Sequence, residues 1–356
     1  MNKTLLKDLS LYLKNYELSN EIRVMEVCGT HTMEFFKTGV RSLLPENFTL
    51  IDGPGCPVCV TPASYVDRAI SMAKKYNAII TTFGDMIKIP SSASSLKKEK
   101  VEGVDVRIVY SPMESIAIAG ENPNRKVIFL SVGFETTAPV EAAVLIEAKK
   151  SNITNLFFLS CNKLTPPAVK ALLDMGEVRI DAFILPGHVC AITGATAWNF
   201  VPTEYNKPSV IAGFKTFDLL TATIKTIQMV QERDYSLVNN YTQVVKDEGN
   251  TTAQQTMYEV FSVCDAYWRG IGIIPNSGLK INDTYKEFDA NLQLPVDIIE
   301  EDPNTSCRCG ELLRGLIKPV DCPLFGSACT PEEPIGPCMV SSEGPCAAFY
   351  RYGGME

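Results

Sequence analysis

Four landmarks of this chain recur at an offset of about 104 residues, and this repeat constrains the fold more than any other feature. The turn at residues 28–32 falls on residues 132–136, with Gly29 on Gly133 and Thr32 on Thr136. The Thr-Pro pair at 61–62 falls on 165–166, and the strand end at 83–85 lies close to the position matching 186–188. Chance recurrence of Gly, Thr and Pro is the alternative, but four landmarks in register favour duplication. We predict two α/β units built on one plan.

Apolar runs of strand length precede the turns, at residues 22–27, 78–83 and 127–132. Strands that alternate with helical patterns indicate a parallel sheet. Ligands of such sheets bind beyond the carboxyl ends of the strands. We therefore predict a cleft between the two units, edged by the side chains that follow the strands: Cys28, His31, Asp85, Glu135, Thr136, Thr137, His188 and Cys190.

Two thiols stand one turn apart in the segment GPGCPVC at residues 53–59. Thr61 is a favourable N-cap and Pro62 suits the first helical position, so Cys56 and Cys59 are predicted to lie at the positive end of a helix. Such a position lowers the pKa of a thiol, and the spacing allows a disulfide or a shared metal. A turn with two small buried residues is the alternative. We favour redox or metal chemistry.

A third region begins near residue 215 with helical patterns at 217–232 and 251–267, followed by a tail rich in Pro, Gly and Cys. Six of the twelve cysteines lie between residues 307 and 346, where little periodic hydrophobicity supports a core. Four thiolates around an iron–sulfur cluster would hold such a segment together. A tetrahedral zinc site is the alternative, although the uneven spacing does not match paired knuckles.

The predicted fold class is therefore α/β, with two similar parallel-sheet units that face a cleft and a helical to irregular, cysteine-rich C-terminal region holding an iron–sulfur cluster. The domain boundaries predicted are 1–20 for a helix that packs on the C-terminal region, 21–120 and 121–214 for the two units, and 215–356 for the third region. A net charge of −8 argues against a nucleic-acid surface. No apolar run approaches the roughly 20 residues of a membrane span, and we expect a cytoplasmic protein.

The motifs together resemble those of the HypD family of hydrogenase maturation factors, across nearly the whole chain. The matching segments are CGTHT at 28–32, GPGCPVC at 53–59, TFGDM at 82–86, GFETTAP at 133–139, PGHV at 186–189 and the tail at 307–352. The resemblance implies a scaffold on which the iron of nickel–iron hydrogenase receives cyanide and carbonyl ligands, with a HypC-type chaperone and a HypE-type cyanide donor. It also implies a 4Fe-4S cluster beside a redox-active cysteine pair.

On this resemblance, Cys28 is the expected thiolate ligand of the iron under assembly. His31 is either a second ligand or a proton donor, or only a hydrogen-bonding residue. The cluster ligands chosen are Cys309, Cys322, Cys329 and Cys346, with Cys307 and Cys338 as alternates. Cys190 departs from the family, which more often has Ser there. Cys264 and Cys161 are expected to be structural.

Two other functions remain open. A general thiol-disulfide oxidoreductase of the ferredoxin-thioredoxin reductase kind would use Cys56 and Cys59 but would not need Cys28. A non-enzymatic, metal-stabilised adaptor would need neither Cys56 nor Cys59. We expect a redox-active assembly factor rather than a simple turnover enzyme, monomeric on its own.

Overall fold

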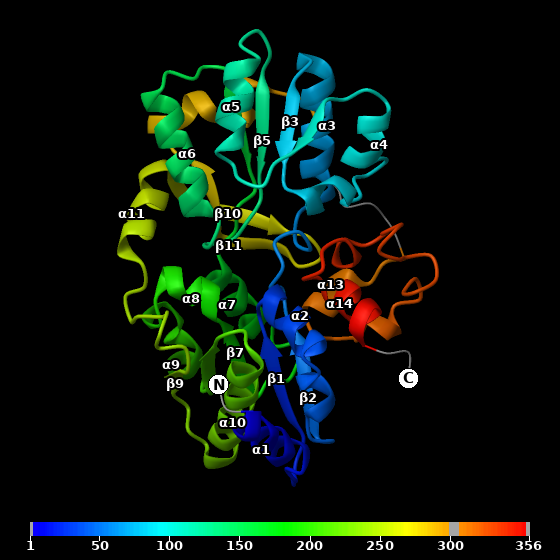
Figure 1. Ribbon diagram of the computed structural model, residues 1–356, viewed down its shortest axis with the longest axis vertical. Helices are drawn as coiled ribbons and strands as arrows, with labels where there is room; N and C mark the ends of the chain where they lie inside the picture. The colour runs from blue at the N-terminus through cyan, green and yellow to red at the C-terminus, as the bar shows by residue number, and fades with distance from the viewer. Residues whose placement is uncertain (1–2, 299–305, 354–356) are drawn as a thin grey trace.

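The computed structural model describes residues 3–298 and 306–353, which form two lobes stacked along the long axis (Figure 1). Sheet A, in one lobe, is parallel with the strand order β2-β1-β7-β8-β9. Its strands are β1 (Ile22–Glu26), β2 (Phe48–Asp52), β7 (Ala182–Pro186), β8 (Ser209–Ala212) and β9 (Leu237–Asn239).

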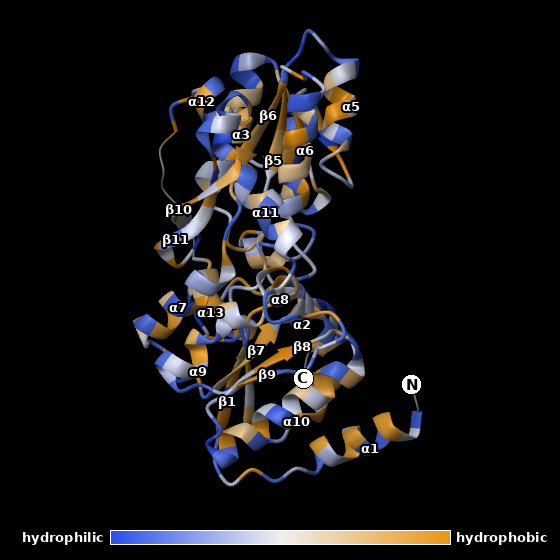
Figure 2. Cartoon of the chain, turned by 90° about the vertical axis from the view of Figure 1, so that its left-hand side faces the viewer, coloured by the Kyte–Doolittle hydropathy of each residue, from blue (hydrophilic) through white to orange (hydrophobic). Residues whose placement is uncertain are grey.

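Sheet B, in the other lobe, is also parallel and has the order β4-β3-β5-β6. Its strands are β3 (Ile79–Thr82), β4 (Val106–Ile108), β5 (Val127–Ser131) and β6 (Leu156–Ser160). Every residue of β3, β5, β7 and β8 is buried, as expected for parallel strands covered on both faces. The α/β class with parallel sheets is thereby confirmed, and Figure 2 shows these strands as hydrophobic ribbons inside each lobe.

The sheets share one plan, but each takes two strands from the other half of the repeat. In sheet A, β1 pairs with β2 and with β7; in sheet B, β5 pairs with β6 and with β3. The third and fourth strands of each half therefore lie in the sheet of the other half. The boundary predicted at residue 120 does not separate the two sheets. Apolar periodicity locates strands but does not say which strands pair, so the sequence did not reveal this exchange.

The exchange makes two segments cross between the lobes. Residues 53–62 lead from β2 to α3, which packs on sheet B through Val66 and Ala69. Residues 161–164 lead from β6 to α7, which packs on sheet A through Val169 and Leu172. The first crossover carries Cys56 and Cys59.

The helices cover the faces of both sheets. Their bounds are α1 (Lys3–Lys14), α2 (Gly29–Lys37), α3 (Ala63–Tyr76), α4 (Leu96–Val101), α5 (Glu114–Glu121), α6 (Ala138–Lys150), α7 (Thr165–Met175), α8 (Gly187–Thr193), α9 (Phe200–Tyr205), α10 (Thr216–Glu232), α11 (Thr251–Val260), α12 (Ala290–Gln293), α13 (Cys309–Leu313) and α14 (Pro345–Tyr352). The N-terminal helix α1 packs on α10, and the Tyr16 hydroxyl that follows it donates to Gln231 at 2.6 Å.

The helix predicted at 217–232 is confirmed as α10, but the one predicted at 251–267 is wrong beyond Val260. There the chain turns into β10 (Phe261–Trp268), which pairs antiparallel with β11 (Gly272–Ile281). Burial along β10 alternates residue by residue, which is the period of a strand. Cys264, assigned to a helix in the sequence prediction, therefore lies on a strand.

The cysteine-rich tail packs into the waist between the lobes, beside α2 and the first crossover (Figure 1). Its α14 contacts α2, and its apolar residues Leu312, Met339 and Val340 share one hydrophobic cluster with Cys56 and Cys59.

Gly55 sets the closest approach between the Cys28 turn and the first crossover. The Gly29 N–H donates to the Gly55 carbonyl at 2.8 Å, and the Gly53 N–H donates to the Glu26 carbonyl at 2.8 Å. A Cβ at residue 55 would lie 2.2 Å from the backbone nitrogen of Cys28, so no side chain fits without moving one segment.

We predict that Gly55→Ala lowers the free energy of unfolding by about 1–3 kcal/mol, the usual cost of overpacking. Urea denaturation followed by circular dichroism measures the change. Gly120→Ala is the matched control, because a Cβ there meets nothing within 4 Å, and it should leave stability equal or slightly higher. Equal stability of Gly55→Ala and the parent would contradict the close approach.

A second prediction concerns Glu141, a fully buried carboxyl on α6. It accepts hydrogen bonds from the Ser131 hydroxyl and the Asn162 amide, and burial raises its pKa from 4.5 to about 7. Between these values the unfolded chain has lost a proton that the native protein keeps, so stability falls as the pH rises. Gln at this position cannot ionise.

As the pH rises from 5 to 8, we therefore expect the free energy of unfolding of Glu141→Gln to increase by about 1–3 kcal/mol relative to that of the parent. Urea midpoints measured across this range test it, with exposed Glu102→Gln as the control. Parallel stability curves for Glu141→Gln and the parent would show that the carboxyl ionises normally.

Candidate functional site

Cys28 follows β1 and caps the N-terminus of α2, as the strand-end prediction required. Its side chain is 7% exposed, and its backbone N–H donates to Glu26 Oε2 at 2.8 Å. Burial, and then the Glu26 carboxyl, raise the pKa of the thiol to about 12. Burial therefore favours the neutral thiol of Cys28 over its thiolate.

Glu26 is a buried acid directly behind Cys28 that the sequence prediction missed. It accepts hydrogen bonds from the Cys28 N–H and the Thr32 hydroxyl. Burial and the neighbouring Asp52 raise its pKa well above the usual value. A carboxyl at the end of the predicted strand at 22–27 was the available signal, because acidic residues are rarely fully buried unless they are paired.

The two histidines lie on either side of one aromatic ring. His31 and His188 both stack on Phe214, with ring centroids 4.6 Å and 3.8 Å from it. His31 is buried, and its Nε2 lies 2.9 Å from the carbonyl of Gly213. Phe214 follows β8 and carries no motif, so the sequence did not identify it.

Burial lowers the pKa of His31 to about 4, so its ring is neutral near pH 7. Because Nε2 must donate to a carbonyl oxygen, the lone pair of the neutral ring is on Nδ1. In the described part of the chain Nδ1 has no hydrogen-bond partner. This arrangement favours His31 as a ligand or proton acceptor over a proton donor.

Cys56 and Cys59 are both buried in the first crossover. The predicted cap is wrong: Pro62 takes the N-cap position of α3, and the Thr61 hydroxyl instead donates to the Pro57 carbonyl at 2.9 Å. The pKa of Cys59 is raised by burial rather than lowered by the helix. At Cys59 the loss of thiolate solvation raises the pKa by more than the positive helix end lowers it.

The strand ends of the second half of the repeat reach the same waist. Glu135 is buried and accepts the Thr165 N–H at 2.8 Å, and burial raises its pKa to about 7. Thr137 caps α6, and Thr136 precedes it in the same turn. The pKa of buried Cys190 is raised by burial and then by Glu135 and Cys28, so these three groups lie near one another.

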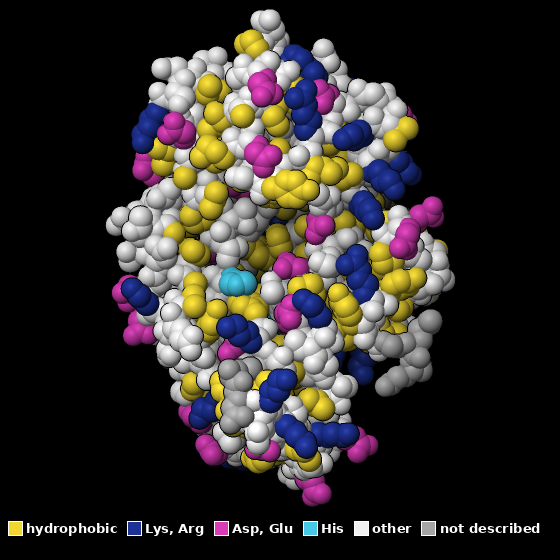
Figure 3. Space-filling view, viewed as in Figure 1, with side chains coloured by type: hydrophobic (Ala, Val, Ile, Leu, Met, Phe, Trp, Pro, Cys, Tyr) yellow, Lys and Arg dark blue, Asp and Glu magenta, His cyan; other side chains and the backbone are white. Residues whose placement is uncertain are grey.

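Asp85 is exposed in the turn after β3 and faces the tail. Burial, and then the charge of Asp85, raise the pKa of Glu343, whose carboxylate accepts the Thr30 hydroxyl at 2.7 Å. The waist therefore joins a strand end of sheet B, the tail and the Cys28 turn. Figure 3 shows this waist as a hollow with hydrophobic side chains and charged residues around it.

Five tail thiols line one small cavity: those of Cys307, Cys309, Cys322, Cys329 and Cys346. Arg308, Leu312, Phe325 and Met339 complete its walls. Cys338 does not line it; it is fully buried close to Cys59 and Cys309, both of which influence the pKa of its thiol. The tail thus connects the Cys56/Cys59 crossover to the thiol cavity.

The donor set of this cavity fits an iron–sulfur cluster, whose ordinary ligand is thiolate. Within residues 3–298 and 306–353, no three His, Cys, Asp or Glu side chains converge closely enough to hold a single metal ion. Cys307 Sγ and Cys309 Sγ are 3.2 Å apart. In these positions they are too close together for each to bind a different iron of one cluster.

Comparison with known proteins gives matches over almost the entire length. The family model described as HypD, hydrogenase formation hypA family, matches residues 2–353. The chain is 43% identical to the hydrogenase maturation factor HypD of Escherichia coli, over 96% of this chain and 92% of that protein. It is also 43% identical to HypD2 of Bradyrhizobium diazoefficiens, over 93% and 89%.

A putative hydrogenase expression/formation protein of Methanocaldococcus jannaschii is 43% identical as well, over 94% of this chain and 93% of that protein. Among the described residues, no helix is long and apolar enough to cross a bilayer. The motifs, the strand-end site and the extent of these matches agree, and the chain belongs to the HypD family of hydrogenase maturation factors.

Proposed function

We propose that this protein is the redox-active scaffold on which the iron of nickel–iron hydrogenase receives its cyanide and carbonyl ligands. The observation that carries the proposal is the adjacency of three kinds of thiol at the waist. Cys28 lies against the first crossover through Gly55, and Cys59 of that crossover contacts Cys338 beside the thiol cavity. An iron-binding group and a dithiol are thus held within one packed unit.

Cys28 supplies the sulfur ligand of the iron that is being assembled. Glu26 accepts the Cys28 N–H and so helps to hold the Cys28 turn in place. The Nδ1 lone pair of neutral His31, in the same turn, is available to receive the proton that iron binding displaces. A soft thiolate suits iron that also carries strong-field ligands.

Cys56 and Cys59 act as a two-electron reservoir. Closing their disulfide forms one S–S bond and releases two electrons and two protons, and opening it takes them back. Four of the cavity thiols hold a 4Fe-4S cluster in this proposal: Cys309, Cys322, Cys329 and Cys346, with Cys307 as the alternate. When bound, that cluster supplies one-electron redox capacity. Cys338 stands between the reservoir and the cavity.

The partners proposed from the family are a HypC-type chaperone, which completes the sulfur ligands of the iron, and a HypE-type protein, which delivers cyanide. A general thiol-disulfide oxidoreductase is the second candidate, supported by the contact of Cys59 with Cys338. It would use the same reservoir without Cys28. The two functions are separated by the effect of removing Cys28.

We expect Cys28→Ala to keep the fold, the cluster iron and the Cys56/Cys59 chemistry, but to abolish the cyanide and carbonyl infrared bands of the complex with the chaperone. Infrared spectroscopy of the complex purified without oxygen measures this. Cys264→Ala, a thiol on β10, is the control and should keep the bands. Bands of normal intensity in Cys28→Ala would favour the general oxidoreductase.

Cys329 and Cys338 should behave differently, because only Cys329 lines the thiol cavity. We predict that Cys329→Ala loses most of its iron, whereas Cys338→Ala keeps the iron but no longer passes electrons between the cluster and the dithiol. Iron and sulfide analysis gives the first readout. Differential alkylation of Cys56 and Cys59, read by mass spectrometry, gives the second. Loss of iron in Cys338→Ala would make it a cluster ligand.

A further inference from the structure

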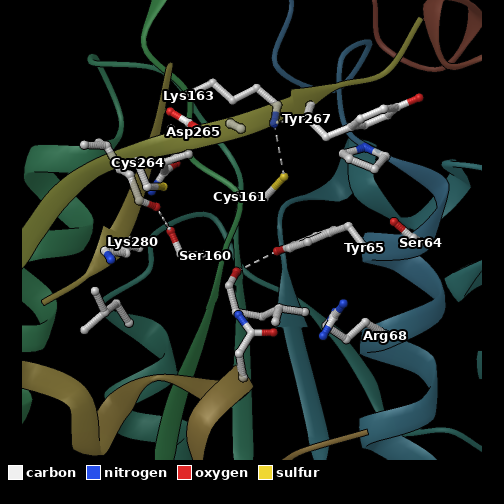
Figure 4. A pocket seen from close by; sticks show the side chains of 18 of the residues that line it. Ser64, Tyr65, Arg68, Ser160, Cys161, Lys163, Cys264, Asp265, Tyr267 and Lys280 are labelled. Carbon is white, nitrogen blue, oxygen red and sulfur yellow. Dashed lines mark hydrogen bonds between the residues drawn. The ribbon is translucent and has the colours of Figure 1, made fainter. Parts of the chain in front are cut away.

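The second crossover, residues 161–164, holds a thiol and an amine in contact at the wall of a cavity of about 590 Å³ (Figure 4). Cys161 Sγ lies 3.7 Å from Lys163 Nζ, and both residues line the cavity. The cavity lies at the carboxyl end of β6, apart from the cysteine sites described above. The function proposed above uses neither residue.

The backbone of this crossover is held from both sides, and this keeps the two side chains together. The Cys161 N–H donates to the Ser131 carbonyl at 2.8 Å, and the Lys163 N–H donates to the Gly133 carbonyl at 3.0 Å. On the other side, Lys163 forms an antiparallel bridge with Gly278 of the β10–β11 hairpin. Two groups that the fold holds in contact react far faster than the same groups free in solution.

The amine of Lys163 is buried, with 2% of the residue exposed, and it is not held by an acid. Its Nζ donates to the Tyr267 carbonyl at 2.9 Å and lies 5.6 Å from the centroid of the Trp268 ring. Among the described residues, no carboxylate lies within ion-pair distance of Nζ. Of its contacts with Cys161, Tyr267 and Trp268, only the thiol becomes an electrophile on oxidation.

Cys161 is open to small oxidants, whereas Cys56 and Cys59 of the first crossover are buried. The cavity that it lines has a volume within the range of about 300–1,000 Å³ that small-molecule sites occupy. Oxidation of an accessible thiol gives a sulfenic acid, which a neighbouring thiol or nitrogen captures. Cys264 lines the same cavity from β10, but the Lys163 amine already touches the Cys161 sulfur.

We propose that Cys161 and Lys163 form a reversible N–O–S bridge when the protein meets hydrogen peroxide. The thiol and the ammonium group consume two peroxide molecules and give the bridge, three water molecules and one proton. One S–H, two N–H and both peroxide O–O bonds break, and one S–O and one N–O bond form. Sulfur and nitrogen each lose two electrons, which the peroxide accepts. One oxygen atom spans the gap between Sγ and Nζ with less movement than a direct S–N bond requires.

The internal repeat places this pair at the counterpart of the Cys56/Cys59 crossover. Counted back from the matched Thr-Pro pairs, Lys163 stands where Cys59 stands. Both crossovers follow the second strand of their half and pass between the lobes. The bridge gives the second crossover an oxidation chemistry of its own, which does not depend on Cys28 or on the tail cysteines.

Mass spectrometry of the intact, anaerobically purified protein, treated with hydrogen peroxide and digested without reductant, tests the proposal. A metal chelator suppresses radical chemistry, and N-ethylmaleimide blocks free thiols before digestion with trypsin. The bridge leaves Cys161 unblocked and Lys163 uncleaved. We therefore expect the peptide 151–170 with one oxygen gained and two hydrogens lost, and its disappearance after treatment with dithiothreitol.

Three results would overturn the proposal. In the first, Cys161 is oxidised while trypsin still cleaves after Lys163. In the second, Cys161 is joined to Cys264 by a disulfide. In the third, the peptide loses two hydrogens but gains no oxygen, which identifies a direct S–N bond.

Variants supply the second arm of the test. Lys163→Arg keeps a cationic donor for the Tyr267 carbonyl but removes the amine, so the yield of the bridged peptide should fall tenfold or more. Lys280→Arg is the matched control, because Lys280 lines the same cavity from β11, and its yield should stay within twofold of the parent. An equal yield in Lys163→Arg would reject the lysine as the partner. If Lys163→Arg fails to fold, the fragment ions of the parent peptide decide, because they place the added oxygen between Cys161 and Lys163 or elsewhere.

Discussion

The pairing of β1 with β7 and of β3 with β5 is the interaction on which the rest of the structure depends. Each pair joins strands that lie far apart in the sequence, with Val24 opposite Ala182 in one sheet and Ile79 opposite Val127 in the other. Because the third strand of each half is exchanged, the chain must cross the waist twice. The functional groups gather there for that reason, since each crossover leaves from the carboxyl end of a strand.

The two crossovers differ in their packing and in the side chains that they carry. The first is close-packed, since Gly55 leaves no room for a side chain against Cys28, and it buries both of its cysteines. The second is shorter and borders open space, with Cys161 and Lys163 at its wall. One backbone plan thus provides a close-packed thiol site in the first half and the wall of a cavity in the second.

Much of the site could be predicted from local sequence. Cys28, His31 and Glu135 follow strands, and the tail cysteines stand in a segment that cannot form its own core, so their grouping was foreseeable. The strand pairing could not be predicted, because nothing in the sequence of β3 indicates that it pairs with β5 and not with β1. Phe214 and Lys163 were missed for a related reason: each acquires its role only from neighbours that are remote in sequence. The error over residues 261–267 arose because apolar spacing there fits a helix as well as a strand.

The buried carboxyls make the native protein less acidic than its composition suggests. The formal charge of −8 counts every Asp and Glu as ionised. Burial raises the pKa of Glu135 and Glu141 to about 7 and that of Glu26 well above its usual value. At neutral pH the folded chain therefore retains protons on groups that an unfolded chain would have released. Its isoelectric point should lie above the sequence value of 5.1, and ion-exchange retention should distinguish the folded from the unfolded chain.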